Sequence, residues 1–311
     1  SYSALAAIAI QSNQNDQHGG QAIPAFDFYL APGVLKTFRK QFKQTLYDIL
    51  DVTDFARFLN FDKIAQTIDK LTTITVDITM LEPFYKDSTE VKRIFEKAYE
   101  KALQKTDRIT YQAMEAFIHN LNTMHSRAGA QVPFSSINFG TDVSPEGRMV
   151  VKNYLLAADA GLGHGETPIF PISIFKVKEG INYNKEDPNY DLFHLSCEVS
   201  AKRLFPNFSF IDAPFNLQYY KPGDYQTEVG YMGCRTRVLG NVVDEDRQIT
   251  PGRGNLSFTS INLPRLGIKH GIVGGAEKPD LEGFYQELGE MMELVKDQLL
   301  ERFEIQCNKR V

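Results

Sequence analysis

Short apolar segments alternate with helical patterns over the second half of this chain. The apolar segments are rich in Ile, Phe and Val and are bounded by Gly or Pro, as buried strands are, and they lie at residues 132–139, 168–177 and 255–263. The helical patterns cover residues 148–160, 189–204 and 280–306. Parallel strands need long crossover connections, which are usually helices. The alternation therefore predicts an α/β fold.

Apolar residues recur at helical spacing in the first part of the chain. Residues 3–11 predict a short helix that breaks near Gly19-Gly20, and a stripe from Phe38 to Leu50 predicts a second helix. Residues 88–126 carry the strongest pattern and contain no Pro or Gly, so they predict one long helix or two nearly collinear helices. We expect a mainly helical region over residues 1–128 and an α/β region over residues 129–311.

One short sequence occurs twice in similar form, as Phe134-Ser135-Ser136-Ile137-Asn138 and, 124 positions later, as Phe258-Thr259-Ser260-Ile261-Asn262. Two related half-barrels would produce such an echo, and so would chance. The sequence leaves both explanations open.

Composition excludes several classes of protein. The net charge of -5 argues against nonspecific nucleic-acid binding, which needs a basic face. The sequence contains no run of 18 apolar residues, so it predicts no transmembrane helix, and the first residues lack the pattern of a signal peptide. The three cysteines are widely spaced, so they encode neither a disulfide framework nor a zinc site. We expect a cytoplasmic protein with no nucleic-acid partner, no membrane partner and no metal ligands of its own.

A cysteine flanked by glycine and arginine is the most informative candidate site. Cys234 lies in the sequence Tyr231-Met232-Gly233-Cys234-Arg235-Thr236-Arg237, which predicts a tight loop, and Asn255 opens the next apolar run. This setting suits a reactive thiol next to a polar substrate better than a disulfide or a metal site. From the motif alone, a buried structural cysteine is equally compatible.

Several short motifs besides the cysteine loop are distributed over the whole chain. In chain order they are Gly19-Gly20, Phe26-Asp27, Leu30-Ala31-Pro32, Asn122-Thr123-Met124-His125-Ser126-Arg127-Ala128-Gly129, Gln131-Val132-Pro133-Phe134, Thr167-Pro168-Ile169-Phe170-Pro171, Asp187-Pro188-Asn189-Tyr190-Asp191, Ser200-Ala201-Lys202-Arg203, Gly252-Arg253-Gly254-Asn255-Leu256 and Asn262-Leu263-Pro264-Arg265. Together with the loop around Cys234, they resemble the anaerobic (class III, glycyl-radical) ribonucleoside-triphosphate reductase large subunit.

The resemblance implies a fold, an activity and three site residues. The fold is part of the ten-stranded α/β barrel of ribonucleotide reductases and glycyl radical enzymes, with N-terminal helices for dimerisation. The activity is reduction of ribonucleoside triphosphates to 2′-deoxyribonucleoside triphosphates by thiyl-radical chemistry. Cys234 matches the radical-carrying cysteine of a finger loop, and Asn255 matches an asparagine that binds the substrate ribose. Met232 matches a position that lines the substrate pocket, although a methionine that fills the core is nearly as compatible.

The resemblance also implies cofactors and partners. The family uses a glycyl radical, generated by an activase that depends on S-adenosylmethionine and an iron–sulfur cluster, and a zinc site in its C-terminal part. The radical glycine, the zinc cysteines and the ATP-binding cone have no match in this sequence. We therefore expect an internal fragment that is inactive alone and binds none of these cofactors. The implied partners are the substrate, deoxynucleoside triphosphate and ATP effectors, a second copy of the chain and the activase; no effector-binding residues are assigned.

Two other functions stay open at this point. A glycyl-radical lyase would share the barrel, although the motif at residues 252–255 argues against it. A non-catalytic nucleotide-binding dimerisation module would share the helical region. Cys197 and Cys307 carry no assigned role.

Overall fold

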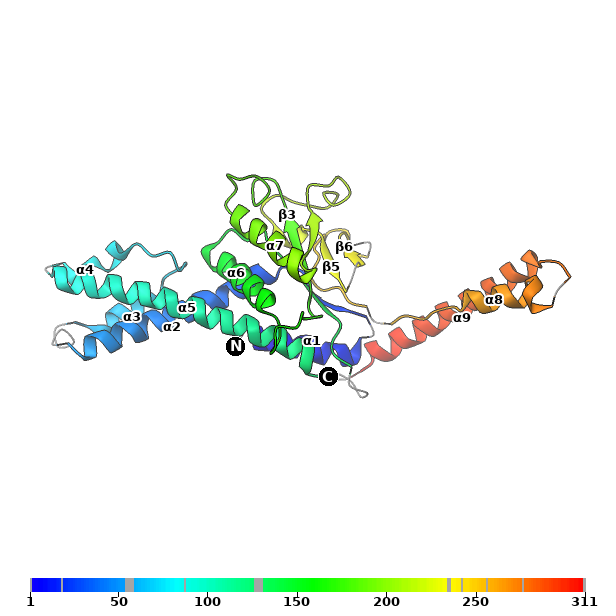
Figure 1. Cartoon of the computed structure of the whole chain (residues 1–311), viewed down its shortest axis with the longest axis horizontal. Coiled ribbons are helices and arrows are strands. Elements are labelled where there is room, and N and C mark those ends of the chain that lie inside the picture. The colour runs from blue at the N-terminus through cyan, green and yellow to red at the C-terminus, as the bar shows by residue number, and fades with distance from the viewer. Residues whose placement is uncertain are drawn as a thin grey trace.

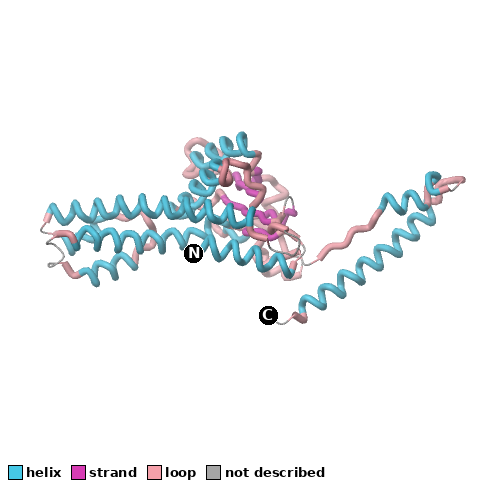
Figure 2. The backbone as a smooth tube through the Cα atoms, turned by 60° about the horizontal axis from the view of Figure 1, so that its bottom comes forward, coloured by secondary structure: helices cyan, strands magenta, loops and turns pink. Residues whose placement is uncertain are grey.

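The molecule is elongated, with a sheet and its covering helices at the centre. A computed structural model describes residues 2–17, 19–53, 59–86, 88–125, 131–233, 236–241, 243–255, 257–275 and 277–309. A bundle of long helices extends from one side of the centre, and a helical arm extends from the other (Figure 1). The same three parts are distinct in a second orientation (Figure 2).

The helical bundle is built on two long antiparallel helices, α2 (Phe26–Asp51) and α5 (Thr89–Thr123). Buried Phe38, Phe42 and Leu46 on α2 recur every four residues, so they form one face. Around them lie α1 (Tyr2–Asp16), α3 (Phe61–Asp69), the 3-10 turn η2 (Ile78–Leu81) and α4 (Glu82–Tyr85). The predicted helix over residues 88–126 is confirmed as one continuous helix, and the helix predicted at residues 3–11 is confirmed and extends further.

Four parallel strands form the central sheet, in the order β1-β2-β3-β4. They are β1 (Gln21–Ile23), β2 (Ser135–Phe139), β3 (Ile172–Val177) and β4 (Asn207–Phe210). Helices α6 (Pro145–Ala160) and α7 (Tyr190–Arg203) connect β2 to β3 and β3 to β4, and the helices from α2 to α5 connect β1 to β2. The predicted α/β class with parallel strands is confirmed, as are the strands near 132–139 and 168–177 and the helices at 148–160 and 189–204. The division into two regions stays a prediction.

The two faces of the sheet are covered by different elements. On one face the rings of Phe139 and Tyr154 lie 5.2 Å apart between centroids, and those of Phe193 and Phe208 lie 5.9 Å apart, so α6 and α7 cover this face. Side chains alternate along a strand, so Ser136, Asn138 and Lys176 point to the other, inner face. The inner face therefore carries buried polar side chains next to the buried apolar side chains of Ile172 and Ile174.

A short antiparallel hairpin lies against the inner face. It consists of β5 (Gly230–Met232) and β6 (Thr236–Val238), preceded by the 3-10 turn η3 (Tyr225–Thr227). The register pairs Met232 with Thr236. The loop predicted around Cys234 therefore belongs, by its place in the sequence, between the two strands of this hairpin.

The helical arm follows the hairpin region. It contains α8 (Leu263–Lys269), the 3-10 turn η4 (Ile272–Gly274) and α9 (Leu281–Cys307), which confirms the helix predicted at 280–306. Helix α9 returns along the extended segment before α8, where the Arg302 guanidinium donates hydrogen bonds to the Ser257 hydroxyl at 3.0 Å and the Phe258 carbonyl at 3.1 Å (Figure 2). No helix in the described part of the chain is long and apolar enough to span a bilayer.

The strand predicted at residues 255–263 is wrong. The described residues of this segment form no strand, and its last residues begin α8, where the Asn262 side chain accepts the Arg265 N–H. A strand needs a neighbour whose backbone groups pair with its own, whatever its local composition. Here Phe258 is 63% exposed instead of packing in a sheet. The two similar sequences therefore have different structures, because residues 135–139 form β2 and residues 258–262 form no strand.

The core of the helical bundle can be tested at Phe38, whose ring centroid lies 5.6 Å from that of Phe42 and 5.9 Å from that of Tyr99. Phe38 is fully buried, so replacement by alanine leaves a cavity. We expect Phe38→Ala to lower the free energy of unfolding by about 3–5 kcal/mol in urea titrations. Lys40→Ala, on the exposed face of the same helix, should change it by less than about 0.5 kcal/mol. Equal effects would contradict this core.

Candidate active site

Two of the three residues singled out from the sequence lie in described parts of the structure. Met232 ends β5 and is buried, with 7% of its surface exposed. Gly233 follows it with a φ of 66°, in the left-handed region that favours glycine. Asn255 is half-buried on the segment after the hairpin. Cys234, like Arg235, lies outside the described residues.

Glycines bring three distant segments together next to the hairpin. The Gly19 N–H donates to the Asn255 carbonyl at 3.4 Å, and a Cβ added to Gly19 would lie 2.1 Å from the Asn255 Cβ. A Cβ added to Gly20 would lie 2.8 Å from the Cα of Gly233. Neither approach leaves room for a side chain. The segments that contain Gly19-Gly20, Gly233 and Asn255 therefore meet at one place.

Side chains of β2 bind the backbone of β5 directly. The Asn138 amide donates to the Tyr231 carbonyl at 2.9 Å, and its oxygen accepts the Tyr231 N–H at 2.8 Å. The Ser136 hydroxyl accepts the Gly233 N–H at 3.1 Å and donates to the Tyr231 carbonyl at 3.2 Å. On β4, the Ser209 hydroxyl lies 3.2 Å from the Tyr231 hydroxyl. Polar side chains of the sheet thus provide the hydrogen-bond partners that the backbone of β5 needs when it is buried.

A buried ion pair fixes the chain just before β5. The Lys176 ammonium lies 3.0 Å from a carboxylate oxygen of Glu228, and the two side chains are 1% and 5% exposed. The same oxygen accepts a hydrogen bond from the Thr141 hydroxyl at 2.8 Å. A buried pair of this kind compensates two desolvated charges only if both partners stay in place. The pair therefore ties the start of the hairpin to β3.

The Asp27 carboxylate supports the turn that carries Thr141. Its Oδ2 accepts the Gly140 N–H at 2.8 Å and the Asp142 N–H at 3.1 Å, which connects α2 to the end of β2. Burial raises the pKa of Asp27 to about 6, an effect larger than the lowering by these hydrogen bonds. Burial also raises the pKa of Asp142. Two carboxyl groups with raised pKa values, Asp27 and Asp142, therefore lie at the turn whose Thr141 hydroxyl binds Glu228.

Two cavities border the hairpin and the segment that follows it. A cavity of about 40 Å³ is lined by Met232, Gly252 and Arg253, among others. A larger one, of about 400 Å³, lies between α1, β1 and Pro251-Gly252. Met232 thus lines the smaller cavity together with Gly252 and Arg253, which precede Asn255 in the chain. In the described ranges, no cluster of three or more His, Cys, Asp or Glu residues is arranged to hold a metal ion.

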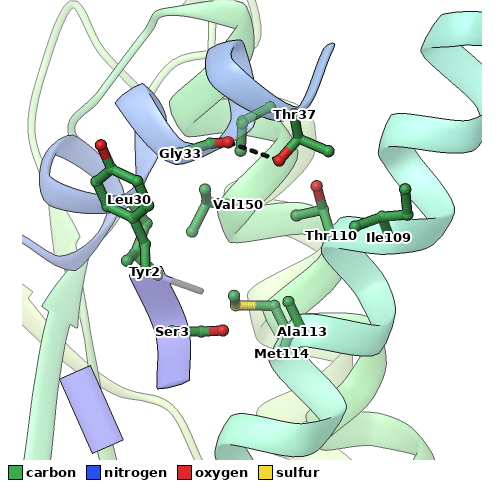
Figure 3. Close-up of a pocket in the computed structure, with 11 residues that line it drawn as sticks. Tyr2, Ser3, Leu30, Gly33, Thr37, Ile109, Thr110, Ala113, Met114 and Val150 are labelled. Carbon is green, nitrogen blue, oxygen red and sulfur yellow. Dashed lines mark hydrogen bonds between the residues drawn. The ribbon is translucent and has the colours of Figure 1, made fainter. Parts of the chain in front are cut away.

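A third cavity lies away from the hairpin, between α1, α2, α5 and α6. It has a volume of about 70 Å³, and Leu30, Val150 and Met114 point into it (Figure 3). The Thr37 hydroxyl beside it donates to the Gly33 carbonyl at 2.8 Å, within α2. None of its lining residues belongs to the hairpin or to the motifs that meet there.

Comparison with known proteins identifies the family. A family model described as anaerobic ribonucleoside-triphosphate reductase matches residues 1–311. The chain belongs to this family. The resemblance inferred from the sequence is therefore confirmed.

Individual relatives carry the same name. The anaerobic ribonucleoside-triphosphate reductases of Haemophilus influenzae and Escherichia coli are 32% and 33% identical to this chain over 207 and 203 residues, which are 66% and 65% of this chain and 27% and 26% of theirs. The one from Enterobacteria phage T4 is 37% identical over 168 residues, 54% of this chain and 27% of its own length. The matched part of the chain thus spans about a quarter of the length of these reductases.

The sequence analysis did not identify the residues that hold the hairpin in place. Ser136 and Asn138 were noticed only within an echo, and Lys176 and Glu228 were not singled out. One signal was available, because Ser136 and Asn138 alternate with Ile137 and Phe139. Such alternation in a buried strand indicates one polar and one apolar face.

The ion pair can be tested by removing one charge and then both. Glu228→Gln leaves Lys176 buried without a compensating charge, so we expect a loss of about 3–5 kcal/mol in the free energy of unfolding. The double variant Lys176→Met with Glu228→Gln removes both charges and should recover most of that loss. Urea titrations of the wild type, both single variants and the double variant give the coupling energy. Strictly additive losses would contradict a direct pair.

Asp27 should make stability depend on pH. Its pKa is raised from 3.8 to about 6, so the folded state binds the proton more tightly than the unfolded state. Stability from this group is present below about pH 4 and is lost as the pH rises to about 6. Relative to Asp27→Asn, which stays neutral, we expect the wild type to lose about 2 kcal/mol between pH 4 and pH 7. Unfolding curves at about pH 4, 5, 6 and 7 measure the difference; a constant difference would contradict the raised pKa.

Proposed function

We propose that this chain is part of an anaerobic ribonucleoside-triphosphate reductase and carries the cysteine that abstracts hydrogen from the substrate. The substrate is a ribonucleoside triphosphate, and the product is the 2′-deoxyribonucleoside triphosphate. The observation that carries the proposal is the family match over residues 1–311, combined with a hairpin whose first strand, β5, is largely buried and whose two strands flank Cys234 in the sequence. The hairpin lies on the inner face of a parallel sheet, where a nucleotide-sized space would be enclosed by further strands of the family's ten-stranded barrel.

The chemistry explains why a cysteine is needed. Acids and bases do not remove hydrogen from C3′ of ribose, because this C–H bond is too strong. A sulfur-centred radical does so reversibly, because the S–H bond formed is similar in strength to the C–H bond broken. The glycyl radical of the whole enzyme, formed by the activase, would supply the unpaired electron. The residues of this chain then have to hold the Cys234 sulfur next to C3′ and exclude water and oxidants.

Asn255 and Met232 complete the proposed substrate site. An amide both donates and accepts hydrogen bonds, so the Asn255 side chain suits a ribose hydroxyl that changes protonation state during turnover. Its backbone is held beside Gly19, next to the hairpin. Met232 borders the small cavity shared with Arg253 and is oriented by β5. We assign Cys234 and Asn255 a catalytic role and Met232 and Asn255 a substrate-binding role.

The wider assembly belongs to the same proposal. The long helices α2 and α5, with α1, would form a homodimer interface, and deoxynucleoside triphosphate or ATP effectors would bind there and influence the active site. The radical-generating activase and the zinc site would act on or in other parts of the whole cytoplasmic protein. All the named relatives are reductases, so a lyase with the same barrel is not favoured.

The decisive experiment replaces Cys234 in the full-length reductase. We expect Cys234→Ser to reduce turnover to background under anaerobic activation, because an oxygen cannot replace the sulfur in reversible hydrogen transfer. The glycyl radical should still form, as electron paramagnetic resonance would show, which separates loss of chemistry from loss of activation. Cys197→Ser, at an exposed thiol, is the control and should retain activity. Turnover by Cys234→Ser would show that the assignment is wrong.

A further inference from the structure

We propose that Asn138, Ser136 and Gly20 are positioning residues that determine where Gly233, the residue before Cys234, lies on the inner face of the sheet. The inference deepens the proposed function and rests on it, because it matters for turnover only if Cys234 is the reacting thiol. None of the three residues needs to touch the substrate. Each acts through the backbone of the hairpin.

Asn138 replaces a neighbouring strand as the partner of Tyr231. Its amide engages both backbone groups of Tyr231, at 2.9 Å to the carbonyl and 2.8 Å from the N–H, and it also donates to the Ile23 carbonyl at 3.3 Å. In the described part of the chain, β5 pairs only with β6. The Asn138 side chain therefore helps to set the distance between β5 and the sheet.

Ser136 fixes the next point along the hairpin. Its hydroxyl accepts the Gly233 N–H at 3.1 Å and donates to the Tyr231 carbonyl at 3.2 Å. Ser136 and Asn138 are two positions apart on β2 and bind residues two positions apart, Tyr231 and Gly233. This matched spacing defines the register of the hairpin, because a shift by one residue would leave buried polar atoms without partners.

Gly20 limits how closely Gly233 approaches the sheet edge. A Cβ on Gly20 would lie 2.8 Å from the Gly233 Cα and 3.1 Å from its nitrogen, and also 3.1 Å from the Phe134 ring. These atoms are backbone or packed ring atoms, so they do not give way as the end of a flexible side chain would. The hydrogen bond from Ser136 holds Gly233 close to the sheet, and steric contact with the Gly20 backbone prevents a closer approach.

Hydrogen transfer gives this arrangement a function beyond stability. Reacting atoms must lie within about 3–3.5 Å, and a misplacement of about 1 Å costs about 100-fold in rate. An alternative explanation is that these hydrogen bonds only satisfy buried polar groups. In that case they would affect the stability of the fold and would not affect turnover separately. The two explanations differ in whether local hairpin mobility and turnover change apart from global stability.

The test compares Asn138→Ala and Ser136→Ala with Asn153→Ala in the full-length reductase. Asn153 is a matched control, because it is also a buried asparagine with two hydrogen bonds, but it lies on α6 away from the hairpin. Hydrogen exchange resolved to single amides reports on Tyr231 and Gly233. We expect these two amides to exchange about 10- to 100-fold faster in the β2 variants, with amides of β3 unchanged, whereas Asn153→Ala affects no hairpin amide selectively.

Turnover provides the second readout. We expect kcat to fall about 100-fold in Asn138→Ala, with KM within about 3-fold and a normal yield of glycyl radical. Ser136→Thr retains the hydroxyl and should keep more activity than Ser136→Ala. Asn138→Gln retains the amide but lengthens the side chain, so it should fail to rescue. Wild-type kcat in Asn138→Gln, or equal effects of Asn138→Ala and Asn153→Ala, would overturn the inference.

Gly20→Ala tests the close approach of Gly20 to Gly233. It replaces Asn138→Ala as the test if Asn138→Ala does not fold. It should displace Gly233 and lower kcat, whereas Gly289→Ala, which adds a methyl group in open space on α9, should not. Failure of the proposed function is distinguishable. An active Cys234→Ser enzyme would overturn that function whatever the exchange data show, whereas an inactive Cys234→Ser enzyme with unaffected β2 and Gly20 variants would overturn only the positioning inference.

Discussion

Buried hydrogen bonds between the inner face of the sheet and the hairpin are the contacts on which the candidate site depends. They run in order along one stretch of backbone, from Glu228 against Lys176 to Tyr231 against Asn138 and Gly233 against Ser136. Each group is removed from water, so losing one partner leaves the other unsatisfied at a cost of about 1–3 kcal/mol, or more for a charge. These contacts therefore favour one conformation of the backbone from Glu228 to Gly233.

The difference between the two faces of the sheet makes this arrangement possible. Aromatic rings of β2, β3 and β4 pack against α6 and α7 and contribute the hydrophobic stabilisation of the centre. The inner face gives up part of that stabilisation, because it buries Ser136, Asn138 and Lys176. What it gains is a defined register for the hairpin. Gly20 and Gly233 complete the fit, because a side chain at Gly20 would separate the two segments.

Periodicity predicted the long elements well and the short ones poorly. The patterns at 88–126 and 280–306 extend over many turns, and α5 and α9 form there. Strands β1, β5 and β6 have three residues each, too few for an alternating pattern, and they were missed. The segment at 255–263 has the composition of a strand without a strand partner. At the candidate site, Met232 and Asn255 were singled out through their motifs, and their roles stay predictions. Glu228 was not singled out, because a single acidic residue in a sequence usually indicates an exposed position.

The class of the fold, the places of the main helices and the family of the chain could be predicted from the amino-acid sequence alone. These properties follow from side-chain spacing and from short motifs, which are local in the chain. The folded chain was needed to show that Asn138 binds Tyr231, 93 positions away, and that Lys176 binds Glu228, 52 positions away. Local spacing carries no information about which polar groups share a buried surface. That pairing is decided when the sheet and the hairpin pack together and exclude water from the groups between them.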